Sequence, residues 1–222
     1  MKKYLPLILI GVGVLVVVGV IFAIIRSSRS KVKQTAEEIV LELPQSQWPV
    51  VTLTPTKNPD VSGSDGHWLD FKVQKIKVSG AASMDYLLVY NTSDGGQQGV
   101  PGAVKLDGKD IERKLLMGSE SSGKFRYDAG VERGTMTVTF RDKNGKSLGK
   151  ISTDFHLQSG VTELTSVDGK FKYTLDKEAK GVFFIIMPTF VEPKSSMSVV
   201  WQNGYGVFAS DGKPHSGEVV NQ

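Results

Sequence analysis

Residues 5–25 form an uninterrupted apolar run, LPLILIGVGVLVVVGVIFAII, without a charged, amide or hydroxyl side chain. An α-helix rises about 1.5 Å per residue, so this run reaches roughly 31 Å, the thickness of the hydrocarbon core of a bilayer. Pro6 falls in the first turn, where the missing N–H of a proline costs little. The run therefore predicts a single transmembrane helix, preceded by a short tail of residues 1–4.

A cleaved signal peptide is the alternative interpretation of this segment. Its apolar core exceeds the usual length of about 7 to 15 residues, and the sequence Arg26-Ser-Ser-Arg29 follows it in place of a small-x-small cleavage site. The chain contains no cysteine, so attachment of a lipid through a thioether is excluded. We expect an uncleaved membrane anchor.

The orientation of the anchor is ambiguous because basic residues flank it on both sides. Counting local charge favours a cytoplasmic C-terminal part, whereas a very short tail ahead of a long apolar run is typical of a signal anchor that precedes an exported domain. We expect the C-terminal domain to lie outside the cytoplasm, with a cytoplasm-facing domain as the alternative. The basic residues after the anchor are predicted to contact anionic lipid headgroups; they are Arg26, Arg29, Lys31 and Lys33.

The net charge of +4 arises from the basic residues in and around the predicted anchor. Of the 27 basic residues, six lie within residues 1–34, which hold no acidic residue. The rest of the chain carries 21 basic and 23 acidic residues, a slight negative excess. A nucleic-acid-binding surface needs a basic stripe on the folded part, and the sequence shows none.

Residues 26–46 are predicted to be a basic flank followed by a linker or stalk. Within them, the apolar positions of residues 31–45 are compatible with a short helix ended by Pro44, and equally with a solvated linker. The pattern is too short for a coiled coil.

From Trp48 onward the chain is patterned for strands. About ten runs of alternating or β-branched residues are separated by clusters of Gly, Pro, Asn and Asp. Such spacing, without a strong amphipathic helix, predicts an all-β soluble part: an antiparallel β-sandwich of immunoglobulin or fibronectin type III character over residues 47–158. Residues 159–212 are predicted either to form a second small β module or to complete the sandwich, and residues 213–222 to be a flexible tail.

The sequence also predicts the burial, pairing and position of several individual strands. In residues 68–78 the apolar positions slip by one residue, which predicts a bulge near Gln74 and Lys75. Residues 86–90 and 182–187 are apolar at successive positions, which predicts strands buried on both faces. Residues 94–99 are expected to form a loop, and residues 103–106 and 111–117 edge strands. Strict alternation in 135–140 and 151–157 around the turn 142–145 predicts a hairpin.

The polar residues offer few candidates for chemistry. His67 lies near Asp65 and Asp70 at the entry to a strand and is a weak candidate for a cation or acid–base site. His156 shares the polar face of its predicted strand and is expected to be a solvated surface residue. The sequence Ser121-Ser-Gly-Lys124 matches the S-x-x-K pattern of serine acyl-transfer enzymes, but that chemistry needs a helix, and here a strand follows.

The aromatic residues offer a second weak candidate. Four of them gather among glycines near the C-terminus, where they would form either a stacking platform for a glycan or peptide, or the core of a small β module; they are Phe190, Trp201, Tyr205 and Phe208.

These patterns favour a non-enzymatic, membrane-anchored protein with a role in binding, adhesion or envelope structure. We expect no cofactor and no metal, and a protein or glycan as ligand. The alternatives are an envelope enzyme or enzyme accessory subunit with a site near His67 and Asp70, and a cytoplasm-facing interaction module.

Overall fold

The computed structural model describes residues 40–194 and 198–220. The apolar run, its basic flank and most of the predicted stalk lie outside these residues. In the part of the chain that is described, no helix is long and apolar enough to cross a membrane. The only helical element there is a short 3₁₀ turn, η1 (Gln45–Gln47). The described chain is all-β and almost entirely antiparallel, as the sequence predicts.

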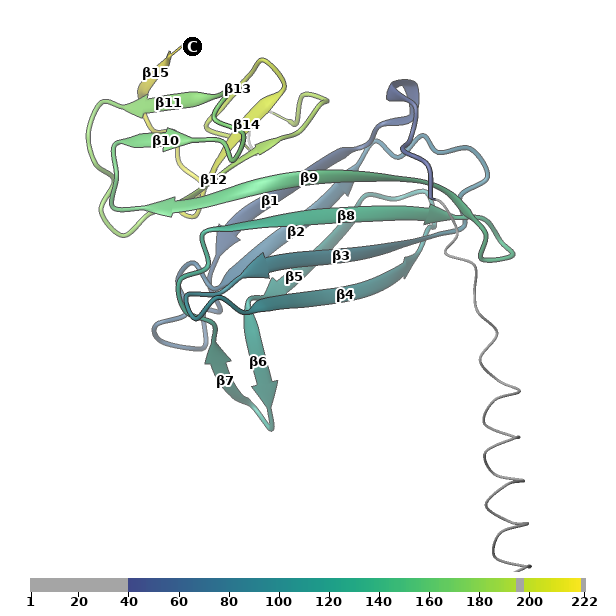
Figure 1. The fold of residues 1–222 in the computed structure, drawn as a ribbon, viewed down its shortest axis with the longest axis horizontal. Helices are drawn as coiled ribbons and strands as arrows, with labels where there is room; N and C mark the ends of the chain where they lie inside the picture. Colours follow the sequence, from purple (N-terminus) through teal and green to yellow (C-terminus); the bar gives the residue numbers. More distant parts are fainter. Residues whose placement is uncertain (1–39, 195–197, 221–222) are drawn as a thin grey trace, which may run out of the picture. The chain divides into compact units, whose positions relative to one another are not determined.

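The strands form three sheets and a separate two-stranded ribbon (Figure 1). The first sheet has the order β1-β2-β5, with β1 (Val50–Thr56), β2 (Trp68–Gln74) and β5 (Ile111–Leu116). The ribbon consists of β6 (Gly118–Ser121) and β7 (Lys124–Tyr127), and the third sheet of β10 (Glu163–Thr165), β11 (Lys172–Leu175) and β15 (Gly217–Val220). The largest sheet has the order β13-β14-β12-β9-β8-β3-β4, in which the strands are β3 (Ser83–Asn91), β4 (Gln97–Lys105), β8 (Arg133–Arg141), β9 (Ser147–Ser159), β12 (Phe183–Pro188), β13 (Val200–Gln202) and β14 (Tyr205–Ala209).

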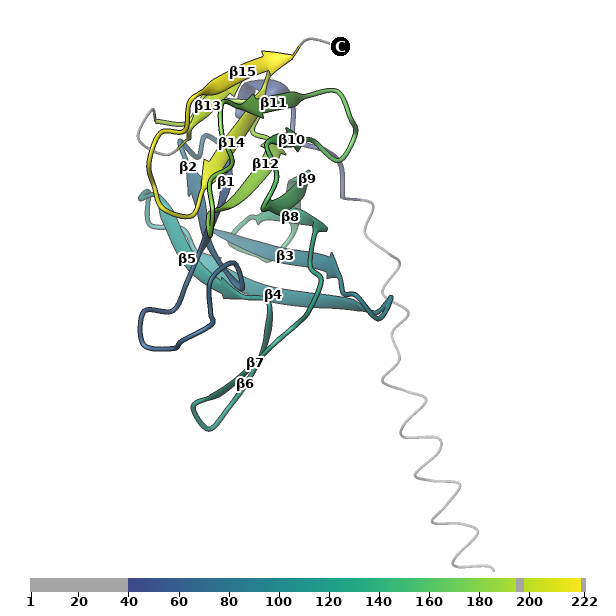
Figure 2. The ribbon, with the colours of Figure 1, turned by 90° about the vertical axis from the view of Figure 1, so that its left-hand side faces the viewer.

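The principal core lies between the β1-β2-β5 sheet and one face of the seven-stranded sheet (Figure 2). The predicted hairpin of residues 135–157 is confirmed as β8 and β9, and its inward residues Met136, Val138 and Phe140 are all fully buried in this core. Burial of each such large side chain contributes roughly 1.5–3 kcal/mol. The two facing sheets thus share one apolar interior without any disulfide.

A second core lies on the opposite face of β12 and β14, beneath β10, β11 and β15. Ile185 and Phe208 face the principal core, whereas Ile186 and Val207 face the second one, and all four are fully buried. The prediction that residues 182–187 form a strand buried on both faces is therefore confirmed. Residues 159–212 contribute both to the seven-stranded sheet, through β12, β13 and β14, and to the layer that covers it.

The matching prediction for residues 86–90 is wrong. Leu88 is fully buried, but Leu87 is 42% exposed. The reason is that β10, β11 and β15 cover the seven-stranded sheet over β12, β14 and the end of β9, so the outer face of β3 has no layer above it. The two predicted edge strands are confirmed, since β4 and β5 each end a sheet.

Other differences concern element boundaries. The phase slip after residue 73 marks the end of β2: Lys75 has φ +54° and turns the chain, and no bulge forms there. The loop predicted for residues 94–99 is shorter, because β4 begins at Gln97. The predicted flexible tail instead contributes β15, which pairs with β11.

The described end of the predicted stalk is extended, so a helix reaching Pro44 is wrong. The backbone of Leu41–Leu43 pairs with Lys150 of β9, and Leu43 is buried. Trp48 donates a 2.8 Å hydrogen bond from Nε1 to the carbonyl oxygen of Leu43. An extended strand can share hydrogen bonds with β9, which a helix cannot, and this pairing holds residues 41–43 against the sheet.

A candidate binding surface on the β6–β7 hairpin

The β6–β7 ribbon projects from the sheets in both ribbon views (Figures 1 and 2). Its tip is a two-residue turn in which Ser122 and Gly123 have φ of 51° and 76°. Positive φ at both central positions matches the right-handed twist of a hairpin. Ser121 and Lys124 are directly opposed across this turn. The S-x-x-K pattern of residues 121–124 therefore forms the tip of a hairpin and not part of a helix, in agreement with the glycine that lies between the serine and the lysine.

Hydrogen bonds fasten the stem of the hairpin to the body and continue the pairing of its two strands. The backbone N–H of Met117 donates to the carbonyl oxygen of His67 at 2.9 Å, and that of Asp128 donates to Met117 at 3.1 Å. The hydroxyl of Tyr90 donates to Oδ2 of Asp128 at 2.7 Å. Burial, together with this hydrogen bond to a carboxylate, raises the pKa of Tyr90 well above its ordinary value. The base of the hairpin is thereby fixed to β3 and to the residue that precedes β2.

One face of the hairpin stem carries an aromatic cluster. The rings of His67 and Tyr127 are stacked with centroids 4.7 Å apart, and Phe125 meets Trp68 edge to face at 5.7 Å. Stacked and edge-to-face pairs add about 0.5–1.5 kcal/mol beyond the area they bury. The Trp68 Nε1 and the Tyr127 hydroxyl are enclosed without a hydrogen-bond partner in the described residues. The cluster therefore combines apolar rings with polar atoms whose hydrogen-bonding capacity is unused.

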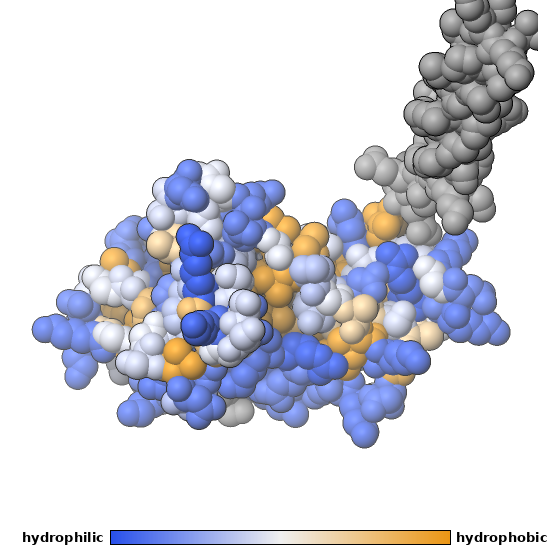
Figure 3. Space-filling view, turned by 90° about the horizontal axis from the view of Figure 1, so that it is seen from below, coloured by the Kyte–Doolittle hydropathy of each residue, from blue (hydrophilic) through white to orange (hydrophobic). Residues whose placement is uncertain are grey.

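The opposite face of the hairpin is hydroxylic and basic. In an antiparallel ribbon directly opposed residues share a face. Ser119 opposes Arg126, and Ser121 opposes Lys124, so two hydroxyls and two cations lie together. All four side chains are exposed. Seen from the side on which the hairpin projects, the surface is mostly polar, with apolar residues reaching it in the middle (Figure 3).

The structure gives the predicted polar residues separate partners. His67 belongs to the aromatic cluster, and burial lowers its pKa, partly opposed by the charge of Asp128. Asp65 forms an ion pair with Lys57 at 3.6 Å, and Asp70 one with Lys114 at 4.0 Å. Within residues 40–194 and 198–220, no group of three His, Asp or Glu side chains is placed to hold a metal ion.

No family model matches this chain. Neither the curated proteins nor the solved structures compared with it give a match. The candidate surface is thus defined by its own geometry.

The four C-terminal aromatic residues do not share one platform. Phe208 is fully buried in the principal core. Tyr205 stacks on Phe171 at 5.3 Å and donates to Asp168 at 2.6 Å; burial and this hydrogen bond raise its pKa to about 12. Trp201 donates from Nε1 to the hydroxyl of Thr189 at 2.8 Å.

Phe190, the fourth, makes its ring contact with a residue outside this group. It is 39% exposed and packs against Trp48 with ring centroids 4.6 Å apart. Its φ of +55° is uncommon for an aromatic residue. The backbone N–H groups of Thr189 and Phe190 both donate to the carbonyl oxygen of Gly204, which holds the chain in this turn.

The solvated position predicted for His156 is wrong. The residue does lie on the polar face of β9, but β10 covers this part of the strand, and His156 is only 8% exposed. Its Nδ1 lies 2.7 Å from the carbonyl oxygen of Thr165. His215 is also engaged, since its Nε2 lies 3.0 Å from Asp211 and its ring meets Phe184 edge to face.

Sequence reasoning missed the hairpin residues Phe125, Arg126 and Tyr127. A signal was present, because the stretch Lys124-Phe-Arg-Tyr127 alternates basic and aromatic residues. Such alternation places the two kinds on opposite faces of a strand. What the alternation could not reveal is that His67 and Trp68, nearly 60 residues earlier, complete the aromatic face.

Proposed function

We propose that this chain is a single-pass membrane protein that displays an immunoglobulin-like β-sandwich outside the cytoplasm and uses it for binding, adhesion or envelope structure, without catalysis. The observation that carries the binding role is the projecting β6–β7 hairpin, with aromatic rings on one face and serines and cations on the other. Loops and hairpins held on a rigid scaffold are common binding elements.

The membrane part of the proposal rests on hydropathy. The 21 apolar residues of 5–25 are long enough to span a bilayer, and the basic residues after them suit anionic headgroups. A protein or glycan ligand is favoured because aromatic rings stack on sugars and apolar side chains, while serines and cations bind hydroxyl and carboxylate groups.

An enzyme with a site near His67 and Asp70 is the second candidate function. The partners of these residues support it less well, because His67 is stacked against Tyr127 and Asp70 is paired with Lys114. A general acid–base pair needs its members within hydrogen-bond reach of one reacting group. A stacked histidine–tyrosine pair and a separate ion pair are more typical of a structural or binding role than of a catalytic site.

Protease shaving of intact cells tests the exported orientation. A protease added outside should remove the domain from full-length chain in the membrane, while a cytoplasmic marker protein stays intact. Cleavage only after lysis would overturn the exported orientation and favour the cytoplasm-facing module. Extraction of the uncleaved chain by detergent, but not by alkaline carbonate, tests the anchor itself.

Arrays of glycans and peptides test the binding role. The full chain in detergent micelles should bind a subset of ligands, and Lys124→Ser/Arg126→Ser should weaken that binding at least fivefold. The matched control is Lys143→Ser, which removes an exposed cation from the β8–β9 turn. Absence of binding to every ligand would favour a purely structural role, and equal losses in both variants would remove the hairpin from the proposal.

A further inference from the structure

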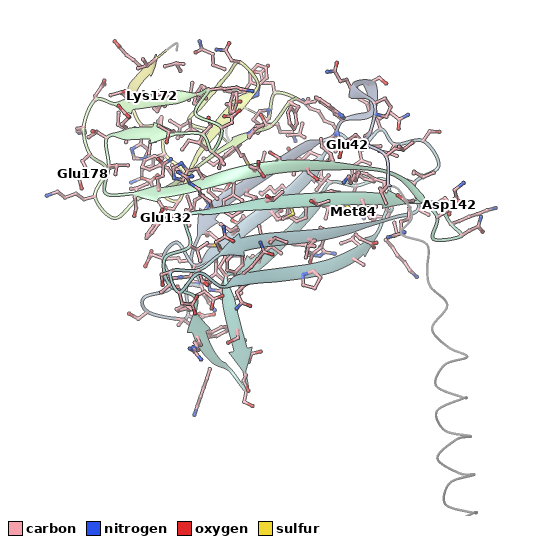
Figure 4. The ribbon with its side chains drawn as sticks, in the orientation of Figure 1. Glu42, Met84, Glu132, Asp142, Lys172 and Glu178 are labelled. Atoms are coloured by element: carbon pink, nitrogen blue, oxygen red, sulfur yellow. The ribbon has the colours of Figure 1, made fainter. Side chains whose placement is uncertain are left out.

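The described chain begins at one end of the sandwich. The backbone N–H of Lys150 donates to the carbonyl oxygen of Leu41 at 2.9 Å, and the N–H of Leu43 donates to the carbonyl oxygen of Lys150 at 2.8 Å. These bonds hold the start of the described chain beside the beginning of β9. The strand registers place the end of β8, the beginning of β3 and the end of β4 at the same end. Figure 4 labels Glu42 and Asp142 at this end of the molecule and Glu132 at the other.

Two connections between the facing sheets lie at this end. Residues 75–82 join β2 to β3, and residues 106–110 join β4 to β5. The N–H of Leu106 donates to the carbonyl oxygen of Ala82 at 3.0 Å, which ties the two connections together. Between them is a hollow of about 280 Å³ whose apolar lining is Ile76, Val78, Ala81 and Leu106. We call residues 75–82 and 105–110 the entry surface.

The entry surface is richer in cations than the opposite end of the same strands. Its two segments hold four lysines and two aspartates, whereas the connections 57–67 and 92–96 at the opposite end hold one lysine and three aspartates. Both aspartates of the entry surface are engaged within the domain, since Asp107 pairs with Lys109 at 3.5 Å and Asp110 accepts a 2.9 Å hydrogen bond from Gln74. Lys77 is exposed and has no ion-pair partner among the described residues. The two ends therefore differ in the sign of their charge.

Apolar side chains are interspersed among these lysines. Ile76 and Leu106 are half-buried at the hollow, and Leu41, at the start of the described chain, is 71% exposed. The nearby carboxylate of Glu42 is paired with Lys150 at 3.6 Å. Lysines whose aliphatic stems lie beside apolar residues suit the boundary between lipid headgroups and acyl chains, where the ammonium groups meet phosphates.

The predicted anchor selects a bilayer as the partner of this surface. Residues 26–39 join the apolar run to Val40, and these fourteen residues span at most about 50 Å. A tether of this length gives an effective concentration on the order of millimolar, so contacts too weak to recruit a free protein are sufficient. The end of the domain that the tether enters is the end with the excess of lysines.

We propose that the entry surface docks on the headgroups of an anionic bilayer, the one that holds residues 5–25. Lys75, Lys77 and Lys109 contact headgroup phosphates, and Ile76 and Leu106 face the acyl boundary. The β6–β7 hairpin, carried by the opposite end of the sandwich, is then kept away from the bilayer and accessible to a ligand. This inference rests on the membrane anchor of the proposed function.

Quenching of a fluorophore by nitroxide-labelled lipid headgroups, which acts only at close range, tests the docking. The chain has no cysteine, so Ser79→Cys and Ser62→Cys each give the full chain a single labelling site. Both serines are exposed, one in the entry surface and the other in the connection 57–67. In vesicles of phosphatidylcholine with one-third phosphatidylglycerol, we expect at least twofold stronger quenching of the label in Ser79→Cys. The difference should shrink in pure phosphatidylcholine and in 1 M salt, where the Debye length is about 3 Å.

Lysine variants in the Ser79→Cys background make the test specific. Lys77→Gln/Lys109→Gln should reduce the quenching on anionic vesicles at least twofold. The matched control is Lys180→Gln/Lys213→Gln, which removes two exposed lysines from other loops and should leave the quenching unchanged.

Flotation of the unlabelled chain with the vesicles in 1 M salt separates this inference from the anchor on which it rests. Loss of flotation would overturn the anchor and the docking together. With flotation intact, the docking alone is overturned by equal quenching of the two labels on anionic vesicles, by quenching that does not depend on lipid charge, or by equal effects of the two lysine pairs.

Discussion

The hydroxyl of Tyr90 donates a 2.7 Å hydrogen bond to Oδ2 of Asp128, and this contact joins the buried end of β3 to the stem of the β6–β7 hairpin. Tyr90 is 1% exposed, so the alternative to this bond in the folded chain is an unsatisfied hydroxyl or carboxylate. The hairpin is thus attached to the sandwich by a buried polar contact as well as by its backbone.

Tyr90→Phe should lower the free energy of unfolding by about 1–2 kcal/mol, because it leaves the Asp128 carboxylate without its donor. Hydrogen exchange should accelerate most at the amides of the hairpin stem, including that of Asp128. The control is Tyr86→Phe, a half-buried tyrosine on the same strand whose hydroxyl has no hydrogen-bond partner among the described residues. Equal effects of the two changes would contradict a specific role for this contact.

Gly66→Ala should be more destabilising than Gly63→Ala. Both glycines have positive φ, +74° and +72°, so each change carries a backbone cost of about 1–2 kcal/mol. A Cβ on Gly66 would also lie 2.5 Å from the ring of Phe183, whereas one on Gly63 would meet nothing within 4 Å. Overpacking adds about 1–3 kcal/mol, measurable as the difference between the two variants in urea unfolding. Equal losses would show that the loop moves away from Phe183.

Ile185→Ala and Ile186→Ala should each lower stability by about 2–5 kcal/mol, although the residues are neighbours and point in opposite directions. Both are fully buried, Ile185 in the principal core and Ile186 in the second one. Hydrogen exchange distinguishes them: Ile185→Ala should loosen β1 and β2, and Ile186→Ala should loosen β10, β11 and β15. A small loss for either variant would contradict burial on both faces of β12.

Stability should fall as pH decreases below about 6.5, through the contributions of His67 and His156. Burial lowers the pKa of both residues in the folded chain from the ordinary value of 6.5. The unfolded chain then binds more protons than the folded one over this range, so acid favours unfolding. Urea unfolding at pH 7.5 and 5.5 measures the slope, which should be shallower in His67→Gln/His156→Gln. An unchanged slope would assign the pH dependence to other groups.

Local patterns in the sequence predicted the strands well where one face alone is apolar. The alternation of Met136, Val138 and Phe140 predicted both the strand and the face that it buries. Continuous apolar runs predict strands that are buried on both faces. This prediction is confirmed for residues 182–187 and is wrong for residues 86–90. The pattern shows that a second face could be buried, but whether it is depends on which segments cover it.

The candidate sites depended on tertiary structure to a greater degree. The sequence neighbours Asp65 and Asp70 make His67 a candidate for an acid–base site, but its ring contact in the fold is Tyr127, sixty residues away. Alternation correctly predicts that His156 lies on the polar face of its strand, but the burial that lowers its pKa comes from β10. Interactions of this kind join segments that are distant along the chain, and local periodicity carries no information about them.

The sequence by itself determined that the domain is all-β, where most of its strands lie and which faces of the β8–β9 hairpin are apolar, because these follow from side-chain alternation and turn residues within a few positions. It also contains the apolar run of residues 5–25, whose assignment as an anchor rests on hydropathy. The tertiary structure decided which outer faces are covered, that Leu87 is exposed while Ile186 is buried, and that a hairpin with two chemically different faces projects from the body. Burial and contact are properties of layers, and a layer is assembled from segments that the sequence keeps far apart.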